Sequence, residues 1–334
     1  MRTYLDWNAT APLRPEARAA MADALDLVGN PSSVHAEGRV AKMLVERARE
    51  AVAVAVGCRP AEVIFTSGAT EAAGVLAGYA AVEVEPTAHD CLQAHAKGAG
   101  GVWAMGLANS ETGVLSEVPR RDGVLLDVVQ AVGRVPFAFG WSGADFAIVS
   151  AHKLGGPKGV GALVVRDGVD MVSLQKGGGQ EMGRRSGTEN LAGIAGFGAA
   201  ITAAMRDLDA GIWEQVRGVR DALEARLLAE VEGTVVVGAD LERLPNTTCL
   251  VTPGWKGETQ VMQMDLAGFA VSAGSACSSG KVRASRVLKA MGFEDGAAGS
   301  AIRVSLGPTT TMDDAMRFAD QWLAHHARFR AKAA

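Results

Sequence analysis

In three stretches of the sequence, an apolar run is followed by residues that could take part in binding or catalysis. The first stretch is "IFTSGATE". Small residues from Ser67 to Thr70 begin a helix there, so backbone N–H groups stay open at the positive end of the helix dipole. Such groups can cradle a phosphate, with the Ser67 or Thr70 hydroxyl as a further donor. An ordinary helix cap, in which Ser and Thr are common, explains the same turn taken alone.

The other two stretches each place one ionisable side chain at the end of an apolar run. In "VLLDVVQAVG" it is Asp127, and in "IVSAHKLGGPKG" it is Lys153. A strand-end aspartate can keep a pyridinium nitrogen protonated, and a lysine amine can form a Schiff base with an aldehyde cofactor. A structural hydrogen bonder and a solvated side chain are the alternatives. The order of phosphate turn, aspartate and lysine favours the chemical interpretation.

Cys277 and Arg303 are two further candidates. Cys277 lies within seven consecutive small residues, 273–279, which is typical of an exposed loop, so its thiol could travel to a substrate. A chance loop cysteine is the alternative. Arg303 lies within an expected strand, where a buried guanidinium needs either a substrate carboxylate or a structural salt bridge. We interpret the remaining cysteines as buried side chains that pack in the core: Cys58, Cys91 and Cys249.

Alternating helical and strand-like patterns must position these residues. We expect helices at 14–27, 36–56, 190–207, 211–231, 258–267, 281–291 and 311–330. Short apolar strands are expected at 102–107, 123–128, 145–149, 160–165, 233–238, 246–251 and 269–272, with another before residue 66. The pattern predicts an α/β fold with a mainly parallel central sheet. The carboxyl ends of strands in such sheets face the ligand crevice.

Composition limits the class of protein. The chain has 334 residues, 48% of them hydrophobic and 21% charged, with a net charge of −4. No basic block indicates nucleic acid, and no long uncharged apolar run indicates a membrane span. The start "MRTYLDWNAT" lacks the apolar core of a signal peptide. Four cysteines without a CxxC pair fit neither a disulfide framework nor a zinc site, so we expect a cytoplasmic protein.

The composition changes near 205–232, from glycine-rich loops to a charged helix. We therefore expect a large domain at 14–205 and a smaller α+β domain formed by 1–13 and 206–334. The large domain would hold the phosphate turn, Asp127 and Lys153.

A series of blocks in one order resembles the cysteine desulfurases of the class V aminotransferase superfamily, the group that serves iron–sulfur cluster assembly and thiolation. The resemblance runs from residue 4 to about residue 311. The blocks are "YLDWNATAPLRPEA", "GNPSSVHAEGR", "IFTSGATE", "NSETGV", "DVVQAVG", "SAHKLGGPKGVGAL", "GGGQEMGRRSGTEN", "SAGSACSSG" and "AIRVSLGPTTT". It implies the type I fold of transferases that depend on pyridoxal 5′-phosphate (PLP).

The resemblance also implies a role for each matched residue. Lys153 would carry PLP, Cys277 would be the nucleophile, and His89 would stack on the ring and move protons. Arg303 would bind the substrate carboxylate, helped by Asn8. The cofactor would further be held by Ala69, Thr70, Asp127, Gln130, Ser150, His152, Thr188 and Asn109.

Within this set the contacts would be divided by position around the cofactor. Asp127 would pair with the pyridine nitrogen, and Gln130 would contact the phenolic oxygen. The phosphate would be bound by Ala69, Thr70, Ser150 and His152. Thr188 would add a phosphate contact from the partner subunit, which implies a homodimer.

The implied reaction converts L-cysteine to L-alanine and leaves a persulfide on Cys277 for a sulfur-acceptor or iron–sulfur scaffold protein. Another class V reaction, either transamination or selenocysteine cleavage, is an alternative, although transamination needs no such thiol. A degenerate PLP-binding partner in a sulfur pathway is a second alternative. The joint presence of Lys153, Asp127, His89, Arg303 and Cys277 favours the enzyme.

Three features depart from the family pattern. Ser110 replaces an asparagine that contacts the cofactor, and adjacent Asn109 is the expected substitute. The segment between His89 and Glu111 is shorter than in related enzymes. The sequence ends with "HHARFRAKAA", whereas the resemblance implies that many relatives have a longer tail, which docks a scaffold protein.

Overall fold

The structure is a computed structural model that describes residues 2–273 and 284–333. It contains two compact units. The large unit comprises Thr10–Ala108 and Ser116–Ala210, and the small unit comprises Met1–Ala9, Asn109–Leu115 and Gly211–Ala334. The division at 14–205 remains a prediction. The segment 109–115 goes with the small unit because its backbone pairs there: Leu115 N donates to Glu242 O at 2.9 Å and Leu244 N to Gly113 O at 2.7 Å.

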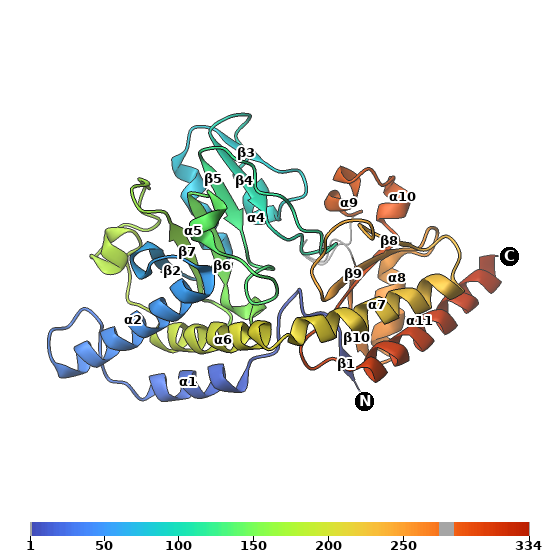
Figure 1. Ribbon diagram of the computed structural model, residues 1–334, viewed down its shortest axis with the longest axis horizontal. Coiled ribbons are helices and arrows are strands. Elements are labelled where there is room, and N and C mark those ends of the chain that lie inside the picture. The colour runs from blue at the N-terminus through green and yellow to red at the C-terminus, as the bar shows by residue number, and fades with distance from the viewer. Residues whose placement is uncertain (1, 274–283, 334) are drawn as a thin grey trace. The chain divides into compact units, whose positions relative to one another are not determined.

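A six-stranded sheet forms the centre of the large unit (Figure 1). Its order is β2 (Val63–Thr66), β7 (Gly161–Val165), β6 (Phe146–Ser150), β5 (Val124–Asp127), β4 (Val102–Gly106) and β3 (Val82–Val84). Strands β3 to β6 run parallel, and β7 runs antiparallel to both of its neighbours. The expected α/β fold with a mainly parallel sheet is therefore confirmed.

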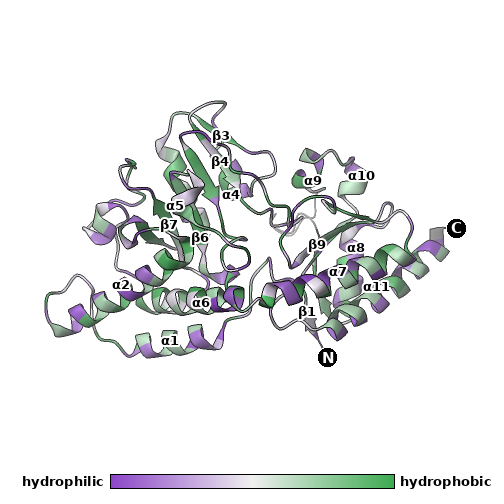
Figure 2. Cartoon of the chain, viewed as in Figure 1, coloured by the Kyte–Doolittle hydropathy of each residue, from purple (hydrophilic) through white to green (hydrophobic). Residues whose placement is uncertain are grey.

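Strands β2, β5, β6 and β7 are short and almost wholly buried, because apolar side chains occupy both faces, whereas the edge strand β3 is only partly buried. Figure 2 shows the hydrophobic residues concentrated along them. Beside the sheet, helix α6 (Leu191–Asp209) packs against α1 (Pro15–Leu25) and α2 (Ala36–Val56). Helix α2 ends at Gly57, whose φ of 70° is a left-handed conformation that favours glycine.

Helix α6 is long and apolar enough to cross a membrane by length and composition, but half of that stretch is buried inside the protein. A buried core helix passes the same test. Glycine explains how closely it packs, since a Cβ at Gly198 would lie 2.9 Å from the Ala48 Cα of α2. The helix thus shows no firm membrane span.

The small unit combines helices with antiparallel strands. One sheet has the order β11 (Ser272–Ala273), β12 (Ala301–Ser305), β9 (Thr247–Val251) and β8 (Val235–Val236), and β1 (Thr3–Tyr4) pairs in parallel with β10 (Phe269–Ala270). The helices described are α7 (Ile212–Glu230), α8 (Gly257–Leu266), α9 (Arg286–Ala290), α10 (Asp295–Ala298) and α11 (Met312–Ala333). Helix α11 packs against α7 and α8.

Several expected elements differ from those observed. The strand expected at 269–272 is two short strands, β10 and β11, which pair in different sheets. Of the helix expected at 281–291, the described part is helical only over Arg286–Ala290. Among the described residues, the pattern also missed five elements of five residues or fewer, namely β1, β3, α4 (Asp90–Gln93), α5 (Phe139–Ser142) and α10. Such short segments carry too few residues for a periodic signal.

Candidate active site

The parallel strands bring three of the expected site residues to one edge of the large sheet. Strand β5 ends at Asp127, β6 is followed by the short 3₁₀ helix η3 (Ala151–Lys153), and β3 leads into the turn that contains His89. Asp127 faces Ile148 of β6 and Gly106 of β4 in register. The carboxyl ends of parallel strands meet at one edge, so Asp127, Lys153 and His89 converge there.

The pKa of Asp127 is set by its burial and by its neighbours. Burial raises the pKa of this carboxyl, and the charges of His89 and Lys153 and the Val129 N–H lower it. The Val129 N–H donates to Asp127 Oδ1 at 2.9 Å. A desolvated carboxylate beside cationic groups is suited to bind a protonated ring nitrogen.

His89 is held by the start of helix α4 (Asp90–Gln93). Its Nδ1 accepts a hydrogen bond from the Cys91 N–H at 3.1 Å, so the side chain caps this helix. An accepting Nδ1 carries no proton, which leaves the proton of the neutral ring on Nε2. The contact therefore fixes both the tautomer and the orientation of the imidazole.

The turn after β2 has the form that a phosphate needs. Gly68, with φ of 156°, occupies the cap position of α3 (Ala69–Ala73), and no side chain among the described residues caps this helix. A Cβ at Gly68 would meet no atom within 4 Å, so the space above it is open. The ordinary alternative, a Ser or Thr side-chain cap, is not the arrangement observed. The first-turn N–H groups of α3 fit a phosphate.

This turn lies beside the end of β6. A Cβ at Gly161 would come within 2.8 Å of the Gly68 Cα and 2.5 Å of the Val149 carbonyl oxygen, so only glycine allows this approach. The Glu71 carboxylate stabilises the turn. Its Oε2 accepts a hydrogen bond from the Ser67 N–H at 2.7 Å, and its Oε1 accepts one from Arg185 Nε at 2.8 Å.

The segment around Lys153 is tightly built. His152 Nδ1 lies 3.2 Å from Thr10 Oγ1, and burial, with the charges of Lys153 and Lys158, lowers the pKa of His152 to about 4. Gly155 has φ of 83°, and a Cβ there would lie 2.6 Å from Arg14 Cγ. Glycine at position 155 thus has both a conformational and a steric reason.

Other expected cofactor residues in the large unit are Ser150, Gln130 and Thr188. Ser150 is buried at the end of β6, and Gln130 is buried with its Oε1 2.6 Å from Arg134 Nη1. Thr188 is exposed in the loop before α6. Their contacts with a cofactor remain predictions.

The small unit holds the expected substrate residues. Arg303 is buried, and its Nη2 pairs with Asp6 Oδ1 at 2.7 Å, while Nη1 donates to the Ser110 carbonyl at 3.0 Å. Its Nε is buried with no hydrogen-bond partner within the described part of the chain. The structural salt bridge is therefore present, and binding of a substrate carboxylate by Arg303 remains a prediction.

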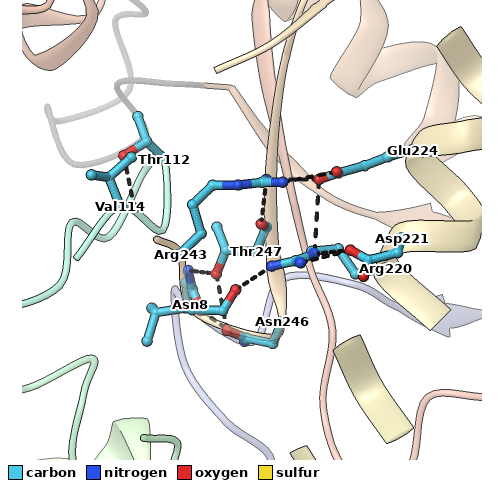
Figure 3. Close-up of polar contacts among 10 residues, drawn as sticks. Asn8, Thr112, Val114, Arg220, Asp221, Glu224, Arg243, Asn246 and Thr247 are labelled. Atoms are coloured by element: carbon cyan, nitrogen blue, oxygen red, sulfur yellow. Dashed lines mark hydrogen bonds and ion pairs between the residues drawn. The ribbon is translucent and has the colours of Figure 1, made fainter. Parts of the chain in front are cut away.

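Asn8 is buried in a polar network, shown in Figure 3. Its Nδ2 donates to the Ser110 carbonyl at 3.1 Å and to Thr247 Oγ1 at 2.9 Å, and its Oδ1 accepts from Asn246 Nδ2 at 3.2 Å. Asn8 and Arg303 therefore hold the same carbonyl. These contacts support a positioning role, and direct contact of Asn8 with the substrate remains a prediction.

Asn109, the expected substitute for the family asparagine, turns its side chain into its own loop. Its Oδ1 accepts from the Glu111 N–H at 2.9 Å and the Thr112 N–H at 3.0 Å. The side chain thus shapes the 109–115 loop, and its cofactor contact remains a prediction.

Cys277, the expected nucleophile, lies outside the described residues. The three other cysteines are poor nucleophiles because only the thiolate attacks. Burial raises the pKa of Cys58 and of Cys249 to about 12. Burial also raises the pKa of Cys91, opposed in part by its hydrogen bond with His89.

Comparison with known proteins matches this geometry. The family model described as aminotransferase class-V matches residues 3–92 and 90–318. The chain belongs to the class V aminotransferase family. Members of this family depend on PLP, so the chain is a PLP-dependent enzyme.

Individual relatives narrow the resemblance. A cysteine desulfurase of Cereibacter sphaeroides is 38% identical over 360 residues, which cover 93% of this chain and 92% of that protein. An IscS-like cysteine desulfurase of Mycobacterium tuberculosis is 34% identical over 367 residues, covering 93% of each. The X-ray structure of a NifS-like protein from Rickettsia africae has a TM-score of 0.89 at 27% identity and covers 98% of this chain and 100% of that one.

The matches also bear on the short segment after His89. The 360-residue alignment is longer than this chain, so the class V relative carries residues that are missing here. The family model breaks at residues 90–92, directly after His89. A shortened connection between His89 and Glu111 is compatible with these matches and remains a prediction.

The residues at the sheet edge fit PLP. The donor set comprises a desolvated carboxylate, a lysine and an open helix start beside Gly68, which match a ring nitrogen, an aldehyde and a phosphate in turn. Sequence reasoning missed the residues that hold the expected site side chains: Glu71, Arg134 and Arg185 in the large unit, and Asp6, which holds Arg303 in the small unit. The helical i, i+4 rule gives no signal for Arg134, because Gln130 and Arg134 lie four residues apart in a turn and not in a helix.

Proposed function

We propose that this chain is a cysteine desulfurase, which converts L-cysteine to L-alanine and carries the sulfur as a persulfide on Cys277. The observation that carries the proposal is the convergence of Asp127, His89 and Lys153 beside the open turn at Gly68. The relatives named as cysteine desulfurases, at 34–38% identity over most of the chain, support it. The other class V reactions are not favoured by these relatives.

Each residue has a distinct task in this proposal. Lys153 holds the cofactor and moves the α-proton of the substrate, and Asp127 holds the ring nitrogen in its protonated form. When bound, PLP supplies an electron sink for the substrate carbon. His89, with Nδ1 accepting from the Cys91 N–H, can give or take a proton only through Nε2 without losing its cap.

The sulfur step is a displacement at the substrate sulfur. The Cys277 thiolate attacks that sulfur, so a sulfur–sulfur bond forms as the carbon–sulfur bond of the substrate breaks. The electron pair of the broken bond remains with the carbon, which takes a proton and leaves as part of alanine. Arg303 binds the substrate carboxylate, and its partners Asp6 and the Ser110 carbonyl fix the plane of the guanidinium.

The proposed function involves two kinds of partner, a second copy of this chain and a protein that accepts the sulfur. We propose a homodimer in which Thr188 contacts the cofactor phosphate of the other subunit, and its exposed position before α6 is compatible with that role. The persulfide would pass to a sulfur-acceptor protein for iron–sulfur cluster assembly or thiolation. We propose the cytoplasm as the compartment.

The test is to purify the protein with PLP and to measure alanine and sulfide formed from L-cysteine. Lys153→Ala should give a colourless protein that forms no alanine. Cys277→Ala should stay yellow and lose sulfide release, while the matched control Cys58→Ala should retain both. A Cys277→Ala protein that releases sulfide at the normal rate would overturn the persulfide step.

A further inference from the structure

A buried arginine joins two of the cofactor residues within the large unit. Arg134 and Gln130 are 3% and 4% exposed, and Arg134 Nη1 donates to Gln130 Oε1 at 2.6 Å. Arg134 Nη2 donates to the Lys153 carbonyl at 3.2 Å. One guanidinium thus contacts the side chain of Gln130 and the main chain of Lys153.

The short contact decides which way the Gln130 amide points. A guanidinium has five N–H donors and no acceptor, so it can bind only the oxygen of the amide. The opposite orientation would place an NH₂ group 2.6 Å from another donor, with both groups buried. Gln130 therefore turns Oε1 to Arg134 and presents Nε2, a pure hydrogen-bond donor, on its other side.

Packing keeps the arginine in this position. Gly133, the residue before it, has φ of 73°, and a Cβ there would lie 2.8 Å from Ala204 Cβ of α6 and 3.2 Å from Leu154 Cδ2. Glycine at 133 lets the chain turn against α6 at this distance. The backbone of Arg134 also donates from its own N–H to the Ala131 carbonyl at 3.0 Å.

We propose that Arg134 is a positioning residue, which holds Gln130 as a donor to the phenolic oxygen of PLP and fixes the main chain that carries Lys153. This inference rests on the proposed function. A donor at that oxygen stabilises its negative charge, which weakens its hold on the proton of the adjacent lysine–cofactor nitrogen. The pKa of that nitrogen is then lower than it is without the donor.

The test is a spectral pH titration of the bound cofactor, together with the PLP dissociation constant and the thermal midpoint of the cofactor-free protein. Gln130→Leu should raise the titration midpoint, and Arg134→Met should raise it in the same direction. Arg134→Lys should recover part of the shift. The double variant Gln130→Leu with Arg134→Met should shift no further than Gln130→Leu alone.

Arg166→Met is the matched control, since Arg166 also donates to two main-chain carbonyls of the large unit, those of Ala144 and Phe139. It should lower the thermal midpoint and leave the titration unchanged. A purely structural Arg134 would give the same result as the control, and that outcome would overturn the proposal. So would an unchanged titration in Gln130→Leu, with cysteine desulfuration intact.

The proposed function fails in a different way. A protein that binds PLP with wild-type spectra but forms no alanine from L-cysteine would contradict the function and still allow the titration. If only the Arg134 variants fail to shift the titration midpoint, the proposed desulfurase activity is not contradicted.

Discussion

Arg303 Nη2 lies 2.7 Å from Asp6 Oδ1, so the expected substrate-binding arginine is held by a carboxylate of the N-terminal segment. Asp6 is itself held, because its Oδ2 accepts from the Ser272 hydroxyl at 2.9 Å. The pair orients the guanidinium before any substrate arrives, which lowers the entropy that substrate binding must overcome.

Asp6→Asn should therefore weaken substrate binding more than it slows the chemistry. We expect KM for L-cysteine to rise about tenfold, equivalent to about 1.4 kcal/mol, with a smaller fall in kcat. Steady-state kinetics measure this, with Asp265→Asn as the control, since Asp265 pairs with exposed Arg2. A fall in kcat at constant KM would contradict the positioning role.

The ion pair of Glu224 and Arg243 in the small unit should matter for stability. Arg243 donates to both carboxylate oxygens of Glu224 at 2.8 and 2.9 Å, and both side chains are at most 10% exposed (Figure 3). Glu224→Ala leaves a buried charge, and we expect it to lower the free energy of unfolding by about 3–5 kcal/mol. Urea unfolding measures the loss.

A second variant separates the charge from the packing. Glu224→Leu combined with Arg243→Met should be more stable than Glu224→Ala alone, because no unpaired charge remains. If the double variant is instead the less stable of the two, the pair contributes net stability beyond neutralising its own charges.

Glu71 and Arg185 should act together on cofactor affinity. Glu71 accepts from the Ser67 N–H of the phosphate turn and pairs with Arg185 at 2.8 Å. Arg185→Met and Glu71→Gln should each weaken PLP binding about fivefold, or about 1 kcal/mol for a partly buried pair. The double variant should bind PLP no more weakly than the weaker-binding single variant. Fluorescence titration of the cofactor-free protein with PLP measures these affinities, and additive losses in the double variant would contradict the coupling.

Asp127 should destabilise the cofactor-free protein at neutral pH. Burial raises the pKa of its carboxyl above the ordinary 3.8, so stability associated with the protonated form is lost as pH rises through the folded-state value. Asp127→Asn should raise the thermal midpoint of the cofactor-free protein at pH 7 and weaken PLP binding. The gain should shrink as pH falls toward 3.8, and a gain that is constant with pH would contradict this origin.

His152 should make the protein sensitive to acid. Because burial lowers its pKa from 6.5 to about 4, the unfolded chain takes up the proton first, and stability falls as pH drops from 6.5 toward 4. We expect a loss on the order of 1–2 kcal/mol, allowing for screening of a partly exposed ring. In His152→Asn, this part of the pH dependence should disappear from unfolding curves of the cofactor-free protein.

The sequence by itself determined the fold class and the candidates at the ends of strands. Apolar runs of four to six residues predicted buried strands, and the position of Asp127 and Lys153 at their ends predicted one edge of one sheet. Those signals are local, because the burial and the ends of a strand depend on the types of residues that are neighbours in the sequence. The elements that were missed are too short for such a signal: β1, β3, α4, α5 and α10.

Only the tertiary structure decided how the candidates are held. Asp6 meets Arg303 across nearly the whole chain, Glu71 meets Arg185, and Asn8 shares the Ser110 carbonyl with Arg303. These partners are far apart in sequence, and no periodic pattern links them. The orientation of the Gln130 amide likewise follows from a 2.6 Å contact between buried groups, which depends on atomic positions that composition and spacing do not specify.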